Sequence, residues 1–258
     1  MTSILFEVLN DGIGVITMNR PEARNALTWE AMESFSQAID GAHAVESSLR
    51  ALVVTGAEGA FCAGGDLFEL DGYPTRLDGA RLADIMGEAL ERLEALPIPT
   101  VAAMEGPALG GGAEVALACD IRVMAEGATI GMMHVRLGIC PAWGGGQRLL
   151  RLVGYSRALE WLAAGRVFTA SEALTYGLTN QIAPEGTAMD AAMALAETIV
   201  RQDPQAVRAI KRLARAGIEL RPGQAAAAER AEFPDLWAAP AHLEASARFV
   251  ARKNHRPV

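Results

Sequence analysis

The sequence predicts an α/β protein followed by a part that is helical almost throughout. Short β-type runs alternate with apolar patterns at helical spacing over the first half of the chain. Two buried-type strands each lead into a glycine-rich loop and then a helix, once after Thr55 and once after Met104. The pattern changes near residue 195. We therefore expect a mixed core over residues 1–195 and a helical region over residues 196–258.

The expected strands are runs of β-branched and apolar residues that end at glycine, proline or charged residues. The first two flank the Asp11-Gly12 turn, and ALVVT reads as a strand buried on both faces. The six expected strands lie at 4–9, 14–18, 51–55, 100–104, 121–124 and 128–131.

The expected helices follow the apolar period of the helix. Leu27, Ala31, Phe35 and Ala38 predict the first one. The second stops before Pro97, which cannot continue a helix, and Pro204 can start a later one. The expected helices lie at 27–42, 80–96, after the glycine triplet 110–112, and at 205–216, 225–232 and 241–252.

Composition excludes several classes of function. The chain of 258 residues is 51% hydrophobic and carries a formal charge of −8, which argues against a general nucleic-acid binder. No apolar stretch approaches the roughly 18 residues of a membrane span. The start, MTSILFEVLNDG, lacks a basic segment and a long apolar run, so we expect a cytoplasmic protein without membrane attachment.

The sequence shows no pattern for a metal or a bound nucleotide cofactor. Its three cysteines are widely spaced, which favours neither a disulfide framework nor a zinc site. The glycine loops do not fit the spacing of the dinucleotide or P-loop motifs. We therefore expect no metal and no prosthetic group.

The stretch GPALGGGAEVALAC places three glycines and Glu114 at the entrance of an apolar helix. A backbone N–H at a helix N-terminus can point at an anion, and two such groups converging on one oxygen form an oxyanion hole. A second interpretation is that the glycines only allow tight packing between strand and helix. Spacing alone does not choose between the two.

Four motifs, in order along the chain, resemble the crotonase, or enoyl-CoA hydratase/isomerase, superfamily. They are NRPEARNAL at 19–27, AFCAGGDL at 60–67, GPALGGGAEVALACD at 106–120 and GICPAWGGGQRL at 138–149. The resemblance implies a spiral of ββα units that binds acyl-CoA, followed by a helical C-terminal region that assembles the chain into a homotrimer or a dimer of trimers. Coenzyme A would then be part of the substrate.

The resemblance also implies roles for individual residues. Gly65 and Gly111 would donate the two N–H groups that stabilise a thioester enolate, and Glu114 would face the reacting carbons. The position of the family's second catalytic glutamate, seven residues before Pro141, holds His134. Contacts to CoA would come from Ala23, Arg24, Ala63, Gly64, Asp66, Leu67 and Lys253, although Asp66 is also typical of a helix N-cap.

His134 leaves the reaction open. Hydration of a 2-enoyl-CoA, or the reverse dehydration, comes first because it is the most common activity of the family. His134 with Pro141-Ala142-Trp143 resembles the ethylmalonyl/methylmalonyl-CoA decarboxylase branch, so decarboxylation of a short branched malonyl-CoA is a close alternative. Double-bond isomerisation comes third. A non-catalytic acyl-CoA-binding protein is the alternative of another class. Trp143 would either wall the acyl pocket or simply pack in the core.

Overall fold

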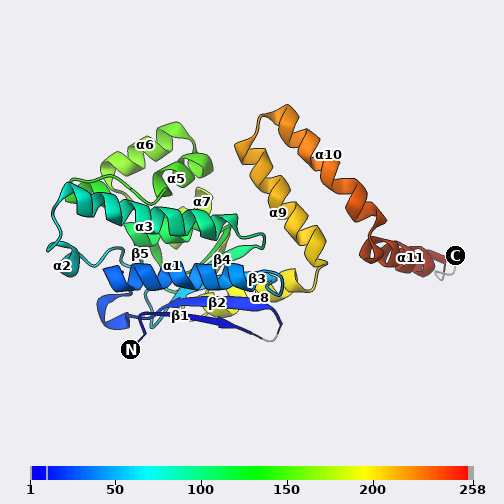
Figure 1. Ribbon diagram of the computed structural model, residues 1–258, viewed down its shortest axis with the longest axis horizontal. Coiled ribbons are helices and arrows are strands. Elements are labelled where there is room, and N and C mark those ends of the chain that lie inside the picture. The colour runs from blue at the N-terminus through cyan, green and yellow to red at the C-terminus, as the bar shows by residue number, and fades with distance from the viewer. Residues whose placement is uncertain (1, 10, 255–258) are drawn as a thin grey trace. The chain divides into compact units, whose positions relative to one another are not determined.

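The computed structural model describes residues 2–9 and 11–254, with side chains up to residue 251. The chain forms two compact units, residues 1–200 and 201–258, and each is described by itself. The expected mixed α/β core and helical C-terminal region are both present (Figure 1). The expected boundary at residue 195 falls inside helix α8 (Ala188–Val200), because this alanine-rich stretch stays helical to its end.

The first unit contains a six-stranded sheet in the order β1-β2-β3-β4-β6-β9. The pairing of β1 with β2 is antiparallel and all others are parallel. These strands are β1 (Ile4–Val8), β2 (Ile13–Met18), β3 (Ala51–Gly56), β4 (Thr100–Met104), β6 (Ile121–Ala125) and β9 (Gln181–Ala183). A smaller sheet joins β5 (Ala108–Leu109), β7 (Thr129–Gly131) and β8 (Val167–Thr169) in that order.

The sequence pattern missed β8 and β9, since it predicted helix almost throughout beyond Gly144. Each of these strands has only three residues, which is too short to show a period of two. The helices of the first unit are α1 (Trp29–Ala44), α2 (Leu67–Leu70), α3 (Arg76–Ala95), α4 (Gly111–Ala118), α5 (Gly145–Val153), α6 (Tyr155–Ala164), α7 (Ala170–Thr175) and α8. Two 3₁₀ turns lie at Pro21–Ala23 and His134–Leu137.

The two faces of the main sheet carry separate apolar clusters. Leu52 and Val54 of β3 belong to the larger cluster, which includes the buried faces of α1, α3 and α4. Ala51 and Val53 point to the opposite face and pack with the alanines of α8. Alternate residues of a strand point to opposite faces. The uninterrupted apolar run ALVVT therefore reflects burial on both sides.

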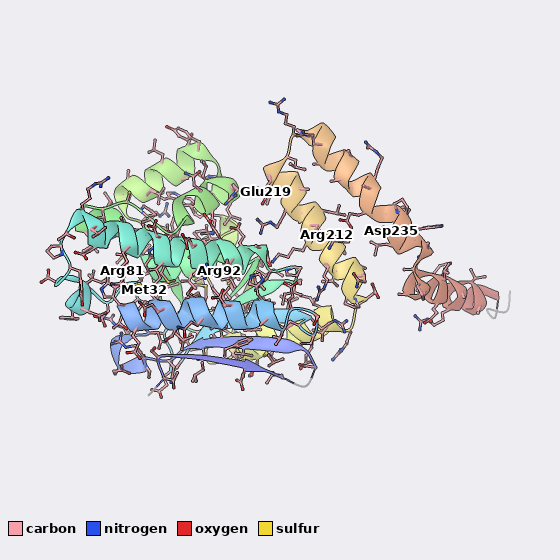
Figure 2. All side chains as sticks on the ribbon, in the orientation of Figure 1. Met32, Arg81, Arg92, Arg212, Glu219 and Asp235 are labelled. Carbon is pink, nitrogen blue, oxygen red and sulfur yellow. The ribbon has the colours of Figure 1, made fainter. Side chains whose placement is uncertain are left out.

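Helices α1 and α3 lie side by side on one face of the sheet (Figure 1). Arg81 of α3 pairs with Glu33 at 2.9 Å, and Arg92 reaches Asp40 at 3.1 Å and the Ser36 hydroxyl at 2.6 Å (Figure 2). The Thr75 capping box fixes the start of α3. Helix α3 is therefore a firmly placed element, and it later proves to support the site.

The second unit consists of α9 (Pro204–Glu219), α10 (Pro222–Ala238) and α11 (Pro240–Asn254). Arg212 of α9 and Glu232 of α10 form a two-point ion pair with both distances at 2.7 Å (Figure 2). Several large apolar side chains of this unit are exposed in the single chain, among them Phe233, Trp237 and Phe249. No helix within the described residues is long and apolar enough to cross a membrane.

Candidate active site

The two glycine-rich loops meet at one edge of the main sheet, because they follow the neighbouring parallel strands β3 and β4. The N–H groups of Phe61 and Cys62 donate to the Pro107 carbonyl, and Leu109 N–H donates back to the Cys62 carbonyl at 3.0 Å. This exchange continues the sheet pairing beyond the strands. The loops of the two expected strand–loop–helix units are therefore joined by backbone hydrogen bonds.

Glycine is required where the loops approach each other. Gly64 has a backbone φ of +96°, and a Cβ added there would lie 2.9 Å from the Leu109 carbonyl oxygen and 3.0 Å from the Gly111 nitrogen. A Cβ on Gly112 would lie 2.0 Å from the Cys62 carbonyl oxygen. Side chains at these positions would push the loops apart. The packing interpretation of the glycines is thus correct for Gly64 and Gly112.

Gly65 and Gly111 themselves keep their amide groups available. Within the described part of the chain, neither N–H donates to a protein acceptor. The close contact between Gly64 and the Gly111 nitrogen brings the two amides to the same region. Gly111 is also the first residue of α4, where the helix leaves N–H groups without partners. The geometry has the parts of an oxyanion hole.

The NRPEARNAL segment is joined to the first glycine loop. Ala63 N–H donates to the Arg24 carbonyl at 3.0 Å, and Leu27 N–H donates to the Gly64 carbonyl at 2.8 Å. Buried Asn25, at a positive φ of 57°, accepts from Arg20 N–H and donates to the carbonyls of Ala57 and Ala60. Motif spacing alone did not identify Asn25, although asparagine is common at positive φ.

Most of the residues expected to contact CoA lie along this junction. Arg24, Ala63 and Gly64 take part in the hydrogen bonds above and Ala23 precedes Arg24, and Arg24 and Leu67 are exposed. Asp66 has a structural role, since its carboxylate caps α2 by accepting from Phe68 N–H and pairs with Arg20 at 2.9 Å. Lys253 belongs to α11, but its side chain lies outside the described residues.

Glu114 is the buried carboxylate of the site, with only 1% of its surface exposed. One oxygen lies 3.0 Å from His134 Nε2 in an ion-pair contact and accepts from Ala142 N–H at 3.4 Å. The other accepts from Trp143 N–H and Gly145 N–H, both at 2.8 Å. Three backbone N–H groups therefore bind the carboxylate, which offsets part of the large cost of burying the charge.

His134 lies at the start of a 3₁₀ turn, with its ring against Glu114. The second ring nitrogen, Nδ1, is buried and has no hydrogen-bond partner among the described residues. An unpaired buried polar atom of this kind is costly.

Trp143 joins three parts of the site. Besides its backbone contact to Glu114, its indole Nε1 donates to the Leu82 carbonyl of α3 at 3.0 Å. Its carbonyl accepts from Arg148 at 2.7 Å, and Arg148 is held by Glu94 of α3. Motif reasoning did not identify Arg148. Its only signal was its place in GGGQRL, five residues beyond the tryptophan.

Burial determines the reactivity of the Cys62 thiol, which lies beside the site. Desolvation raises the pKa of Cys62 to about 12, with a smaller opposing effect from the Gly64 N–H. A thiol of this kind stays neutral near pH 7 and is not a nucleophile. No group of histidine, cysteine and acidic side chains in the described residues could hold a metal ion.

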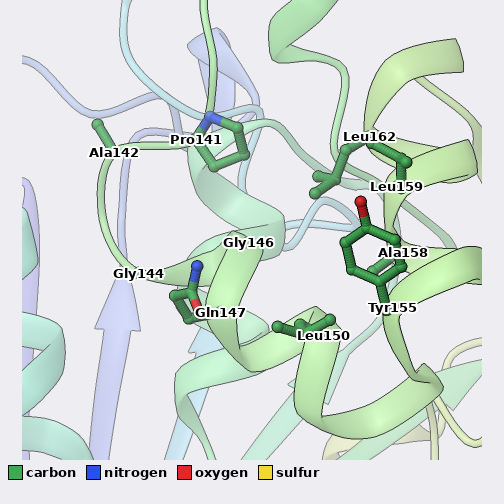
Figure 3. A pocket seen from close by; sticks show the side chains of 10 residues that line it. All are labelled: Pro141, Ala142, Gly144, Gly146, Gln147, Leu150, Tyr155, Ala158, Leu159 and Leu162. Atoms are coloured by element: carbon green, nitrogen blue, oxygen red, sulfur yellow. The ribbon is translucent and has the colours of Figure 1, made fainter.

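A cavity of about 490 Å³ lies on the α6 side of the loop that carries Trp143 (Figure 3). Pro141 and Ala142 line it from this loop, and Leu150, Tyr155 and Leu162 line it from α5 and α6. Glu114, His134, Gly65 and Gly111 do not line it. The cavity is therefore adjacent to the candidate site and distinct from it.

Comparisons with known proteins place the chain in a family. The family described as "Enoyl-CoA hydratase/isomerase" matches residues 9–255. An ethylmalonyl-CoA decarboxylase of Mus musculus is 35% identical over 92% of this chain and 74% of its own length. A short-chain-enoyl-CoA hydratase of Clostridium acetobutylicum is 34% identical over 93% of this chain and 92% of its own. The crystal structure of an enoyl-CoA hydratase from Bacillus anthracis matches with a TM-score of 0.90 and 32% identity, covering 97% and 96% of the two chains.

Proposed function

Since the chain belongs to the enoyl-CoA hydratase/isomerase family and is an acyl-CoA-processing enzyme of it, we propose that it decarboxylates a short branched malonyl-CoA through a thioester enolate. The observation that supports this most is the crowded carboxylate of Glu114. A hydratase needs a carboxylate that can hold and activate water, whereas three backbone N–H groups and the His134 ring already surround the Glu114 carboxylate. This crowding favours decarboxylation over the hydration that is most common in the family.

In the proposed reaction, the bond between Cα and the substrate carboxylate breaks and carbon dioxide leaves. The electron pair moves into the enolate, whose oxygen accepts from the N–H groups of Gly65 and Gly111. Such preorganised donors stabilise charge that develops in the transition state. A proton must then reach Cα to give the saturated acyl-CoA. One proton is consumed for each carbon dioxide released.

His134 is the proposed carrier of that proton. Its Nε2 lies 3.0 Å from the Glu114 carboxylate, and its Nδ1 has no hydrogen-bond partner among the described residues, so Nδ1 is the proposed proton-exchanging atom. Imidazole exchanges protons near neutral pH. In this scheme Glu114 orients the imidazole and does not touch the reacting carbon. It is a positioning residue, and His134 is the catalytic one.

The test measures carbon dioxide released from ethylmalonyl-CoA and, separately, hydration of crotonyl-CoA. Wild type should release carbon dioxide and hydrate crotonyl-CoA poorly. His134→Ala should lower the decarboxylation kcat by about 10²–10⁴, the range for a positioned acid or base. His43→Ala is the matched control, because the His43 ring lies on α1 and contacts the Arg92 carbonyl of α3 and the Glu46 carboxylate.

The role of Glu114 has its own control. Glu114→Gln should slow turnover, because the imidazole loses the carboxylate that orients it. Glu105→Gln should have no such effect, although Glu105 also accepts from two backbone N–H groups, those of Gly186 and Ala188. Rapid hydration of crotonyl-CoA without carbon dioxide release would overturn decarboxylation in favour of hydration. Acyl-CoA binding without either turnover would favour a binding protein.

Hydration is the second candidate. It is supported by Glu114, which matches one of the two glutamates that hydratases of the family use, and by the similarity to a short-chain-enoyl-CoA hydratase.

For assembly, we propose a homotrimer or a dimer of trimers formed through residues 201–258. The exposed Phe233, Trp237 and Phe249 support this, since symmetric assembly commonly covers such surfaces. A monomer in light scattering at micromolar concentration would count against it. A cytoplasmic location and CoA contacts through Arg24 and Lys253 remain part of the same proposal.

A further inference from the structure

We propose that the Trp143 indole limits the acyl group to a short chain with a small branch, which makes Trp143 the specificity-determining residue of the site. This inference rests on the proposed acyl-CoA site at Gly111 but not on which reaction occurs there. It starts from the close packing of the ring on the oxyanion-hole glycine. A Cβ added to Gly111 would lie 2.1 Å from Cζ3, 2.5 Å from Cη2 and 2.9 Å from Cε3 of Trp143.

These three atoms all belong to the six-membered part of the indole. That part of the ring therefore lies against the Gly111 Cα, one bond from the nitrogen proposed to bind the thioester oxygen. An oxygen that accepts this N–H lies about 3 Å from the nitrogen. The acyl carbons are only two or three bonds further on. Whatever is bound at Gly111 must therefore extend beside the indole or stop before it.

The ring is fixed in place and cannot swing aside. Trp143 is 5% exposed. Its Nε1 donates to the Leu82 carbonyl, its N–H to Glu114 and its carbonyl accepts from Arg148. Rotating the indole would break the first of these bonds and open a space in the core. A rigid wall rejects a longer chain, whereas a flexible side chain would adapt to it.

The same placement explains how the Trp143 side chain can limit the size of the acyl group without changing the position of Glu114. The backbone of Trp143 holds Glu114, and only the side chain faces the glycine. A smaller side chain would leave the Glu114 contact intact. The volume freed beside Gly111 would then accept additional methylene groups, each of which contributes about 0.8 kcal/mol on burial, or roughly fourfold in affinity.

The experiment is calorimetric titration with acetyl-, butyryl-, hexanoyl- and octanoyl-CoA, which contain no carboxylate to lose. In wild type the affinity should stop rising beyond butyryl-CoA. In Trp143→Leu the hexanoyl-CoA affinity should rise at least tenfold relative to acetyl-CoA. Trp143→Phe should show a smaller rise, because phenyl removes only part of the wall. Trp161→Phe is the matched control, since Trp161 is buried among Phe168 and Tyr176.

The outcomes separate this inference from the proposed reaction. Unchanged chain-length preference in a cooperatively folded Trp143→Leu variant would overturn the inference, and so would a rise equal to that of Trp161→Phe. If Trp143→Leu does not fold, Trp143→Phe decides the question by the same ratio. Failure of wild type to decarboxylate any malonyl-type CoA would refute the proposed reaction. The titrations would still test the chain-length preference, because they measure binding and not turnover.

Discussion

Gly64 offers the sharpest test of how the two loops create the site. Replacing it with alanine has two effects. A non-glycine residue at positive φ costs about 1–2 kcal/mol of folding free energy. In addition, the new methyl group would lie 2.9 Å from the Leu109 carbonyl oxygen and 3.0 Å from the Gly111 nitrogen, both of them backbone atoms. Since neither is the end of a flexible side chain, the loops must separate.

The separation should weaken catalysis more than binding. Gly65 and Gly111 must both direct their N–H groups at one oxygen, and the loss of one such donor costs about 10²–10³ in kcat. We expect Gly64→Ala to lower kcat by about 100-fold, with a much smaller change in the affinity for acetyl-CoA. Both quantities can be measured by substrate turnover and by calorimetric titration.

Gly59 provides the matched control. It lies in the same loop at a φ of +80°, and a Cβ added there meets no atom within 4 Å. Gly59→Ala should therefore lose a similar amount of folding free energy in urea denaturation and keep its kcat within about twofold. If Gly64→Ala and Gly59→Ala have the same kcat, the close approach of the loops does not shape the site and the reasoning fails.

Two further predictions concern stability and reactivity. Asn25→Ala should lower the free energy of unfolding by about 3 kcal/mol in urea denaturation, because it removes three hydrogen bonds, one of them buried and two partly buried, from a residue at positive φ; a loss below about 1 kcal/mol would contradict this. Iodoacetamide at pH 8 should modify exposed Cys140 and spare buried Cys62 and Cys119, as mapped by mass spectrometry of peptides. Since the pKa of Cys62 is raised to about 12, its thiolate is rare at pH 8 and increases only as the pH approaches that value. Equal labelling of Cys62 and Cys140 in the folded protein would refute the assignment.

Local sequence signals were enough to predict the class of fold and most of the elements. ALVVT predicted a strand buried on both faces, and the structure places its alternate residues in two different apolar clusters. Asp66 predicted a helix cap and forms one. These predictions succeed because burial period, turn residues and caps are properties of neighbouring residues. The short strands β8 and β9 were not predicted, because three residues are too few to show the alternation of buried and exposed side chains in a strand.

The sequence by itself also determined which residues have chemistry to offer: the glycine triplet, Glu114 in its apolar helix and a histidine where the family has a glutamate. Tertiary structure alone decided how Glu114 is used. Its carboxylate accepts from Ala142, Trp143 and Gly145 N–H and lies beside His134 Nε2, and these residues are 20 to 31 positions away along the chain. Likewise, the indole of Trp143 lies against Gly111 and donates to the Leu82 carbonyl of α3. Hydrogen bonding and close packing depend on distances in space. The motif could therefore name the carboxylate, and only the folded chain could show which groups surround it.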